Sequence, residues 1–252
     1  MDLGIKNKTT IVTGGSRGVG KEIALTLANE GANVVITYQS NREKADEVVK
    51  AIEATGQKGL AIHANLANAD DAVSIISQSI KAFGTLDILV NNAAIWPTGY
   101  VKSIKLEDWN TTLDVNLTSV FLTSQAFLNH CLEIEQPGEI LNITSQAAFH
   151  GSTTGHSHYA ASKAGMIAFT KSMAREHAKD GIRVNNLALG IVETDMIREK
   201  LEKDASYYVN RIPLGRVAQP GDIADIAAFL VSKRAGYITG ATIDATGGML
   251  MR

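Results

Sequence analysis

The chain has 252 residues, of which 45% are hydrophobic and 20% charged, so it is long enough to bury its own core as one large α/β domain. Lys and Arg number 24 against 26 Asp and Glu, a net charge of −2, and this balance lacks the basic excess that binding to a nucleic-acid backbone requires. A single cysteine, Cys131, excludes an intrachain disulfide scaffold and is typical of a reducing compartment.

The sequence contains no run of 18 consecutive apolar residues, and its first ten residues have no apolar stretch after their charges. We therefore expect neither a membrane span nor a secretion signal, which favours a cytoplasmic protein. Glycines and prolines are spread through the chain, without a repeat or a linker. This predicts one domain over residues 1–252.

Short β-branched runs alternate with longer stretches that space apolar residues three and four positions apart. The first pattern predicts strands buried on both faces, and the second predicts amphipathic helices. The predicted strands are Thr9–Thr13, Asn33–Tyr38, Gly59–Ala64, Leu86–Val90, Glu139–Thr144, Arg183–Leu189 and Ala241–Ala245. The predicted helices are Gly18–Glu30, Asn41–Thr55, Asp70–Phe83, Leu106–Cys131, Tyr159–Lys179 and Gly221–Ser232. This alternation predicts a doubly wound, Rossmann-type parallel sheet of about seven strands with helices on both faces, and a ligand crevice beyond the carboxyl ends of the strands.

A glycine-rich turn over residues 13–20, TGGSRGVG, follows the first predicted strand and opens the first helix. Glycines there allow a tight turn and a close approach of the backbone to a pyrophosphate at the helix N-terminus. Such a string alone also fits an ordinary loop, but its place between a strand and a helix favours a dinucleotide site. The turn residues expected at this site are Gly14, Ser16, Arg17, Gly18, Val19 and Gly20.

The glycine spacing T-G-x-x-x-G-x-G, the NNAA segment over residues 91–94 and the YAASK segment over residues 159–163 resemble the short-chain dehydrogenase/reductase family. The resemblance covers nearly the whole chain in the family's order. The chain departs from the family at Ala94, where a glycine is usual, and by one extra residue between Ser145 and Tyr159. The resemblance implies further contacts to a nicotinamide dinucleotide from Asn65, Leu66, Asn92, Ala93, Val192, Thr194, Tyr159 and Lys163.

The end of the second predicted strand, YQSNR over residues 38–42, carries no acid. A carboxylate there would bond the ribose hydroxyls of NAD and repel a 2′-phosphate, so its absence favours NADP(H). By resemblance Arg17 binds the 2′-phosphate, and Tyr38, Ser40, Asn41 and Arg42 lie beside it. The alternative for both arginines is a solvated surface charge.

Tyr159 and Lys163 lie four residues apart near the start of a predicted helix, so both side chains project from one face. A free tyrosine, with a pKa of about 10, is a poor acid or base near neutrality. Because a nearby ammonium favours the phenolate, we expect Lys163 to lower the pKa of Tyr159. The alternative is a plain surface pair, which is common at this spacing.

Ser145 ends the fifth predicted strand, where its hydroxyl is expected to bond the substrate carbonyl and the developing oxyanion; a turn serine is the alternative. Asn116 matches the family's asparagine, which holds a water that relays protons from the lysine, although a structural hydrogen bond would also satisfy its amide. The resemblance implies catalysis by Asn116, Ser145, Tyr159 and Lys163. Hydride then passes between the nicotinamide and a carbonyl carbon, while Tyr159 protonates the oxygen.

Two loops, one after the fourth predicted strand and one before Tyr159, are expected to border the crevice. Trp96 and Tyr100, after the fourth strand, are expected to wall an apolar pocket. A metal site at His156 and His158 is less well supported, because no carboxylate or cysteine accompanies them, and we predict no metal. Residues 190–212 are expected to cover the substrate, with residues 197–212 as a lid.

The carboxyl-terminal third, with RIPLGR and GYITGATI, most resembles the 3-oxoacyl-carrier-protein reductase branch. That branch docks an acidic carrier protein on basic residues, where this chain has residues 133–136, EIEQ, and Lys179-Asp180. Since acid there opposes docking, the sequence favours NADPH-dependent reduction of a small ketone or aldehyde, or oxidation of the alcohol. The alternatives are 3-oxoacyl-carrier-protein reduction and a non-catalytic NADP(H) sensor. The resemblance also implies a homotetramer built through the two longest helices.

Overall fold

A computed structural model describes residues 2–152, 154–195 and 197–252. Within these residues, parallel strands form one seven-stranded sheet in the order β3-β2-β1-β4-β5-β6-β7. The strands are β1 (Thr9–Val12), β2 (Asn33–Tyr38), β3 (Gly59–His63), β4 (Ile88–Asn91), β5 (Gly138–Ser145), β6 (Ile182–Leu189) and β7 (Thr242–Ala245). The doubly wound Rossmann-type fold predicted from the sequence is therefore confirmed.

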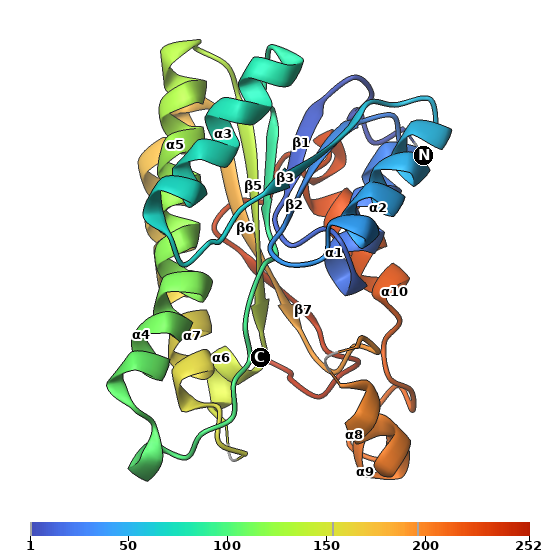
Figure 1. The fold of residues 1–252 in the computed structure, drawn as a ribbon, viewed down its shortest axis with the longest axis vertical. Coiled ribbons are helices and arrows are strands. Elements are labelled where there is room, and N and C mark those ends of the chain that lie inside the picture. The colour runs from blue at the N-terminus through green and yellow to red at the C-terminus, as the bar shows by residue number, and fades with distance from the viewer. Residues whose placement is uncertain (1, 153, 196) are drawn as a thin grey trace.

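Helices cover both faces of the sheet (Figure 1). The helices are α1 (Gly18–Asn29), α2 (Arg42–Ala54), α3 (Ala69–Phe83), α4 (Leu106–Leu113), α5 (Ser119–Glu133), α6 (Ala147–His150), α7 (Ser157–His177), α8 (Arg198–Lys203), α9 (Ala205–Val209) and α10 (Pro220–Leu230). One core lies between the sheet and α1, α2 and α10, and a second lies between the sheet and α3, α5 and α7.

The central strands supply both cores because consecutive side chains of a strand point to opposite faces. Ile11 packs in the core on the α3 side, whereas its neighbour Val12 packs in the core on the α1 side. Leu89 and Val90 of β4 divide in the same way. This explains why the strands read as continuous apolar runs in the sequence.

The single helix predicted over Leu106–Cys131 is interrupted in the structure. Residues Asp114–Thr118 form a π-helical turn between α4 and α5. Asn116 lies in this turn, and such wide turns are frequent at functional sites. The apolar spacing on either side continues almost unchanged, so periodicity alone did not reveal the break.

The segment predicted to cover the substrate contains two short helices, α8 and α9, which Figure 1 shows below the carboxyl end of the sheet. Within this segment, Met196 lies outside the described residues. Helix α6, directly after β5, was also not predicted, because four residues are too few to show a helical period.

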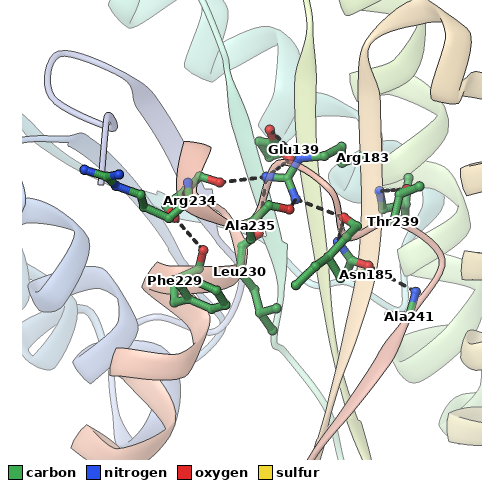
Figure 2. Close-up of polar contacts among 12 residues, drawn as sticks. Glu139, Arg183, Asn185, Phe229, Leu230, Arg234, Ala235, Thr239 and Ala241 are labelled. Carbon is green, nitrogen blue, oxygen red and sulfur yellow. Dashed lines mark hydrogen bonds and ion pairs between the residues drawn. The ribbon is translucent and has the colours of Figure 1, made fainter. Parts of the chain in front are cut away.

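At the amino-terminal ends of β5 and β6, a partly buried arginine holds the loop after α10 (Figure 2). The Arg183 guanidinium lies 2.9 Å from Glu139 Oε2 and donates to the carbonyl oxygens of Ser232 at 2.9 Å and Ala235 at 2.8 Å. These bonds fix the segment that leads from α10 into β7. These bonds therefore hold the end of the sheet that lies opposite the carboxyl ends of the strands.

Candidate active site

The carboxyl ends of β1 and β4 meet where the strand order reverses, and Thr13 links the segments that follow them. Its hydroxyl oxygen accepts hydrogen bonds from the backbone N–H groups of Asn92 at 2.9 Å and Ala93 at 3.0 Å. The Asn92 amide in turn donates to the Thr13 carbonyl at 2.9 Å. Asn92 and Ala93 are thus held against the glycine-rich turn, as the sequence predicted for a shared cofactor site.

The glycines of the first turn are required by its geometry. Gly14 and Gly18 have φ angles of +65° and +54°, in the left-handed region that favours glycine. A Cβ at Gly20 would lie 2.4 Å from both the Gly14 carbonyl oxygen and Asn92 Nδ2. This close approach brings α1 to the end of β1 without intervening side chains.

The turn fits a pyrophosphate. Helix α1 begins after Arg17 without a side-chain cap, so the first backbone N–H groups of the helix face the crevice. Ser16 and Val19 are partly exposed in the same turn, and Arg17 is exposed beside them. These residues would hold the phosphates of a dinucleotide, to which the helix N-terminus is attractive.

The segment after β6 returns to this turn. A Cβ at Gly18 would lie 3.3 Å from Thr194 Cγ2, so Thr194 lies directly against the glycines. Val192 is buried and pairs with Ala218 in a short parallel bridge. Gly18 and Thr194, 176 positions apart in the chain, therefore border one cradle.

The residues predicted beside the adenosine ribose lie at the ends of β2 and β3. Ser40 and Asn41 are exposed, and Asn41 Oδ1 also caps α2 by accepting from Lys44 N at 2.9 Å. Tyr38 packs edge-on against His63. Arg42 is not a lone surface charge, because its guanidinium lies 3.5 Å from Asp46. Arg17 is accordingly the stronger candidate for a phosphate contact.

Asn65 and Leu66 differ in their surroundings. The Asn65 side-chain oxygen already accepts from Gln39 Nε2 at 3.3 Å and from Ala67 N at 3.2 Å. Leu66 is buried in the core on the α3 side. Asn65 therefore reaches an adenine only through its partly used oxygen, and Leu66 lies beneath it as core.

Three of the predicted catalytic residues meet at the carboxyl edge of β5. Ser145 is the last residue of β5, and Tyr159 and Lys163 lie on the first turns of α7. The Lys163 Nζ atom is 5.8 Å from the centre of the Tyr159 ring. Lys163 is only 2% exposed, and its Nζ donates to the Ile143 carbonyl oxygen at 2.7 Å. The surface-pair alternative is therefore wrong.

The expected net fall in the pKa of Tyr159 is not found in the structure. Burial raises the pKa of Tyr159, and a hydrogen-bonding contact with Ser145 opposes that rise. Burial also lowers the pKa of Lys163 to about 7. Desolvation dominates at both groups because the site lies inside the fold. Tyr159 thus stays protonated near neutrality, as a proton donor requires.

Asn116 is fully buried and joins two parts of the site. Its Oδ1 accepts from Ile95 N at 2.9 Å, and its Nδ2 donates to Ile95 O at 3.0 Å and to Ser162 Oγ at 3.2 Å. Ser162 donates to the Tyr159 carbonyl at 2.7 Å. The amide therefore makes the structural bonds considered as an alternative, and these bonds connect the loop after β4 to the helix that carries Tyr159.

The loop residues are arranged differently from the expectation. Trp96 stacks on His156, with ring centroids 4.1 Å apart, whereas Tyr100 is 60% exposed. His158 is buried, and burial lowers its pKa, while the charge of Asp108 opposes that shift. In the described part of the chain, no group of three or more His, Cys, Asp or Glu residues is placed to hold a metal ion.

Sequence reasoning missed the residues that position this site. Thr13 orients Asn92 and Ala93, and Thr37 accepts from Gly14 N at 3.0 Å. Thr13 ends its predicted strand and Thr37 is the last residue but one of the next, so a hydroxyl close to a strand end was the available signal. Ser162 acts by donating to the Tyr159 carbonyl oxygen. Ile143 acts through its own backbone carbonyl oxygen, which accepts from Lys163, and no residue pattern in the sequence indicates such a backbone contact.

Comparison with known proteins decides the family. A family sequence model described as enoyl-(acyl carrier protein) reductase matches residues 14–250. The chain belongs to the short-chain dehydrogenase/reductase family. It is accordingly an oxidoreductase, as the motifs predicted.

Curated relatives match over nearly their whole length. The 3-oxoacyl-[acyl-carrier-protein] reductase of Staphylococcus aureus is 42% identical over 97% of this chain and 98% of its own. The enzyme of the same name from Synechocystis is 42% identical, covering 97% of each chain.

Solved structures agree with the fold throughout. A short-chain dehydrogenase from Burkholderia cenocepacia, in complex with NADP, superimposes with a TM-score of 0.91 at 36% identity, covering 97% of this chain and 98% of its own. A short-chain dehydrogenase/reductase from Serratia marcescens has a TM-score of 0.91 at 37% identity with the same coverage.

No described helix is both long and apolar enough to cross a membrane.

Proposed function

We propose that this chain is an NADPH-dependent reductase that converts the keto group of a 3-oxoacyl thioester to a hydroxyl. The observation that carries the reaction class is the convergence of Ser145, Tyr159 and Lys163 at the same carboxyl end of the sheet as the glycine-rich turn. The names of the curated relatives support the thioester. They favour a substrate that the sequence alone placed second.

The roles of the side chains follow from their positions. When bound, NADPH supplies the hydride to the carbonyl carbon. Tyr159, protonated near neutrality, gives its phenolic proton to the carbonyl oxygen, and the Ser145 hydroxyl donates to the same oxygen as negative charge develops. The Lys163 ammonium then stabilises the phenolate that remains. With a pKa of about 7, Lys163 is also suited to returning a proton.

NADP(H) is proposed over NAD(H) on three grounds. The end of β2 carries no carboxylate, and Arg17 is exposed at the start of α1. A related structure holds NADP. A guanidinium binds a 2′-phosphate through charge-assisted hydrogen bonds that NAD does not offer.

A small free ketone or aldehyde is the second candidate substrate, and the charge of one surface favours it. Glu133 ends α5, Glu135 follows it, and Asp180 lies just beyond α7; all three are exposed. An acidic carrier protein approaching these places would meet like charge, which slows encounter. The His177 Nδ1 atom lies 3.1 Å from the Asp180 carboxylate.

One experiment separates the two candidates. The same 3-oxoacyl group is offered on acyl carrier protein, on coenzyme A and as a free ketone, and kcat/KM is measured with NADPH. Preference for the carrier-bound form supports the first candidate, and preference for the free ketone supports the second. Turnover of none of them, with NADPH still bound, moves the assignment to the non-catalytic sensor.

A charge-reversal pair sharpens this test. Glu133→Lys combined with Glu135→Lys is expected to raise kcat/KM for the carrier-bound thioester and leave the coenzyme A thioester unchanged. Glu47→Lys combined with Glu53→Lys, on the remote surface of α2, is the control matched for net charge. A rise in this control as large as in the Glu133/Glu135 variant would show that the place of the charge is irrelevant.

The proposal includes a cytoplasmic homotetramer. Phe121 of α5 is 41% exposed and packs edge-on against Phe169 of α7, which leaves apolar surface along these helices. Such surface is typical of an interface between copies. Light scattering after size exclusion tests it, and a monomer at micromolar concentration would contradict it.

A further inference from the structure

A stacked aromatic pair joins the two loops that border the catalytic residues. The rings of Trp96 and His156 are inclined by only 21°. Trp96 follows Ile95, whose backbone is bonded on both sides to the Asn116 amide. His156 is the N-cap of α7, three residues before Tyr159, and its carbonyl oxygen accepts from Ala160 N at 2.9 Å. The pair therefore lies at the start of the helix that carries the proton donor.

Further contacts hold the two loops together as one unit. His156 Nδ1 donates to the Pro97 carbonyl at 2.8 Å, and this assignment follows because a carbonyl oxygen only accepts. Gly99 N donates to Gly155 O at 2.7 Å, and Gly99 also forms a parallel bridge with His156. Gly155 has a φ of +79°, and a Cβ there would lie 3.3 Å from the Gly99 carbonyl. The stack is thus backed by main-chain bonds on both loops.

The two stacked rings differ in exposure. His156 is 2% exposed, whereas Trp96 keeps part of its surface accessible. The indole therefore covers the imidazole on one face. Tyr100, the other aromatic residue of the same loop, points to solvent. Of the stacked pair, Trp96 therefore supplies the accessible apolar surface.

We propose that the Trp96–His156 stack is a fixed wall that limits the length of the group attached to the substrate carbonyl, which makes this chain selective for short substrates. The inference rests on the proposed carbonyl reduction and deepens it. Because several hydrogen bonds hold the stack in place, it can move aside only with a loss of free energy. Each methylene of a substrate chain that extends past the stack would therefore overpack the pocket. One methylene can change discrimination by about ten- to 200-fold in such pockets.

Four variants test the wall. Trp96→Ala removes it, and Trp96→Phe keeps a ring in place. His156→Asn keeps a donor for Pro97 but removes the surface on which the indole stacks. Tyr100→Ala is the control, because it removes an aromatic ring of the same loop that is 60% exposed. The measured quantity is the ratio of kcat/KM for 3-oxooctanoyl to that for acetoacetyl N-acetylcysteamine thioester with NADPH.

Trp96→Ala is expected to raise this ratio at least about tenfold, and His156→Asn is expected to raise it in the same direction. Trp96→Phe, which shortens the wall but keeps a ring, is expected to raise it less than Trp96→Ala does, and Tyr100→Ala is expected to keep it within about twofold of the wild type. An equal loss on both thioesters in Trp96→Ala would overturn the inference, since that result indicates general disruption. A shift in Tyr100→Ala as large as in Trp96→Ala would overturn it as well.

A binding measurement tests the inference independently of turnover. Calorimetric titration of both thioesters into the NADP+ complex, which cannot reduce them, gives dissociation constants for the wild type and Trp96→Ala. Tighter binding of the longer thioester in the variant alone supports the wall, and unchanged constants overturn it. A wild type that reduces neither thioester would contradict the proposed function and leave this comparison valid. Where Trp96→Ala does not fold, His156→Asn decides the outcome.

Discussion

Lys163 Nζ donates a hydrogen bond to the carbonyl oxygen of Ile143 at 2.7 Å. Ile143 lies two residues before Ser145 in β5, so this bond ties the lysine to the strand that also presents the serine. Thr144 strengthens the connection, because its hydroxyl donates to the Lys163 carbonyl at 3.1 Å. The relative positions of Ser145, Lys163 and Tyr159 are therefore set by the junction of β5 and α7.

Removing the phenolic hydroxyl tests the proton donor. Tyr159→Phe is expected to lower kcat by about 10²- to 10⁴-fold, the usual contribution of a positioned general acid. NADPH affinity should change little, because the ring and its surroundings remain. Stopped-flow NADPH oxidation and fluorescence titration measure the two quantities. Tyr100→Phe, at an exposed tyrosine, is the control, and a Tyr159→Phe variant with near-normal kcat would rule out this role.

Removing Arg17 tests the choice of cofactor. Arg17→Ala is expected to weaken NADPH binding by about ten- to 100-fold, which corresponds to the loss of charge-assisted hydrogen bonds. NADH binding should hardly change, because NADH lacks the 2′-phosphate. Arg42→Ala should have a smaller effect, since Arg42 already pairs with Asp46. Equal losses for both dinucleotides in Arg17→Ala would argue against the phosphate contact.

The glycine-rich turn predicts a contrast between two alanine substitutions near helix N-termini. Gly20→Ala would place a Cβ 2.4 Å from the Gly14 carbonyl oxygen, so we expect a loss of about 1–3 kcal/mol in the free energy of unfolding together with weaker NADPH binding. Gly221→Ala in α10 has open space around the added Cβ and should be neutral or stabilising by up to about 1 kcal/mol. Urea unfolding measures both. Equal stability of the two variants would contradict the packing described.

The buried carboxyl at the base of the sheet predicts a pH dependence. Burial raises the pKa of Glu139 from 4.5 to about 7, although Arg183 opposes the rise. The folded protein then binds this proton more tightly than the unfolded chain, so the stabilisation is complete below pH 4.5 and is lost as the pH rises through about 7. The loss amounts to roughly 3 kcal/mol at most.

Glu139→Gln removes this titration and keeps an acceptor for Arg183. The free energy of unfolding of the wild type is therefore expected to fall relative to that of Glu139→Gln between pH 4.5 and pH 8. Urea titrations at pH 4.5, 6 and 8 measure the difference. A difference that does not vary with pH would mean that Glu139 is ionised in the folded protein throughout this range.

Much of the fold could be predicted because its signals are local and repeated. The strands carry β-branched runs and the helices carry apolar spacing, and turn residues separate them. The break at Asp114–Thr118 could not be predicted in this way. It depends on the bonds between Asn116 and Ile95, which are far apart in the chain.

The site was predicted by residue type and order, and its geometry required the structure. The motifs identified Ser145, Tyr159 and Lys163, but the pKa of Tyr159 depends on burial, which the sequence does not give. Trp96 was expected to wall an apolar pocket together with Tyr100, four residues away. Its partner is instead His156, 60 residues away, because the folded sheet brings the two loops together.

The central claim is that this site reduces a 3-oxoacyl carbonyl with NADPH, and its most direct test is the initial rate of NADPH oxidation. Purified wild type and Tyr159→Phe would be compared with acetoacetyl thioester, using NADPH and NADH in parallel. We predict rapid oxidation of NADPH by the wild type, much slower oxidation of NADH, and almost none by Tyr159→Phe. No oxidation by the wild type, or equal rates for the wild type and Tyr159→Phe, would contradict the account.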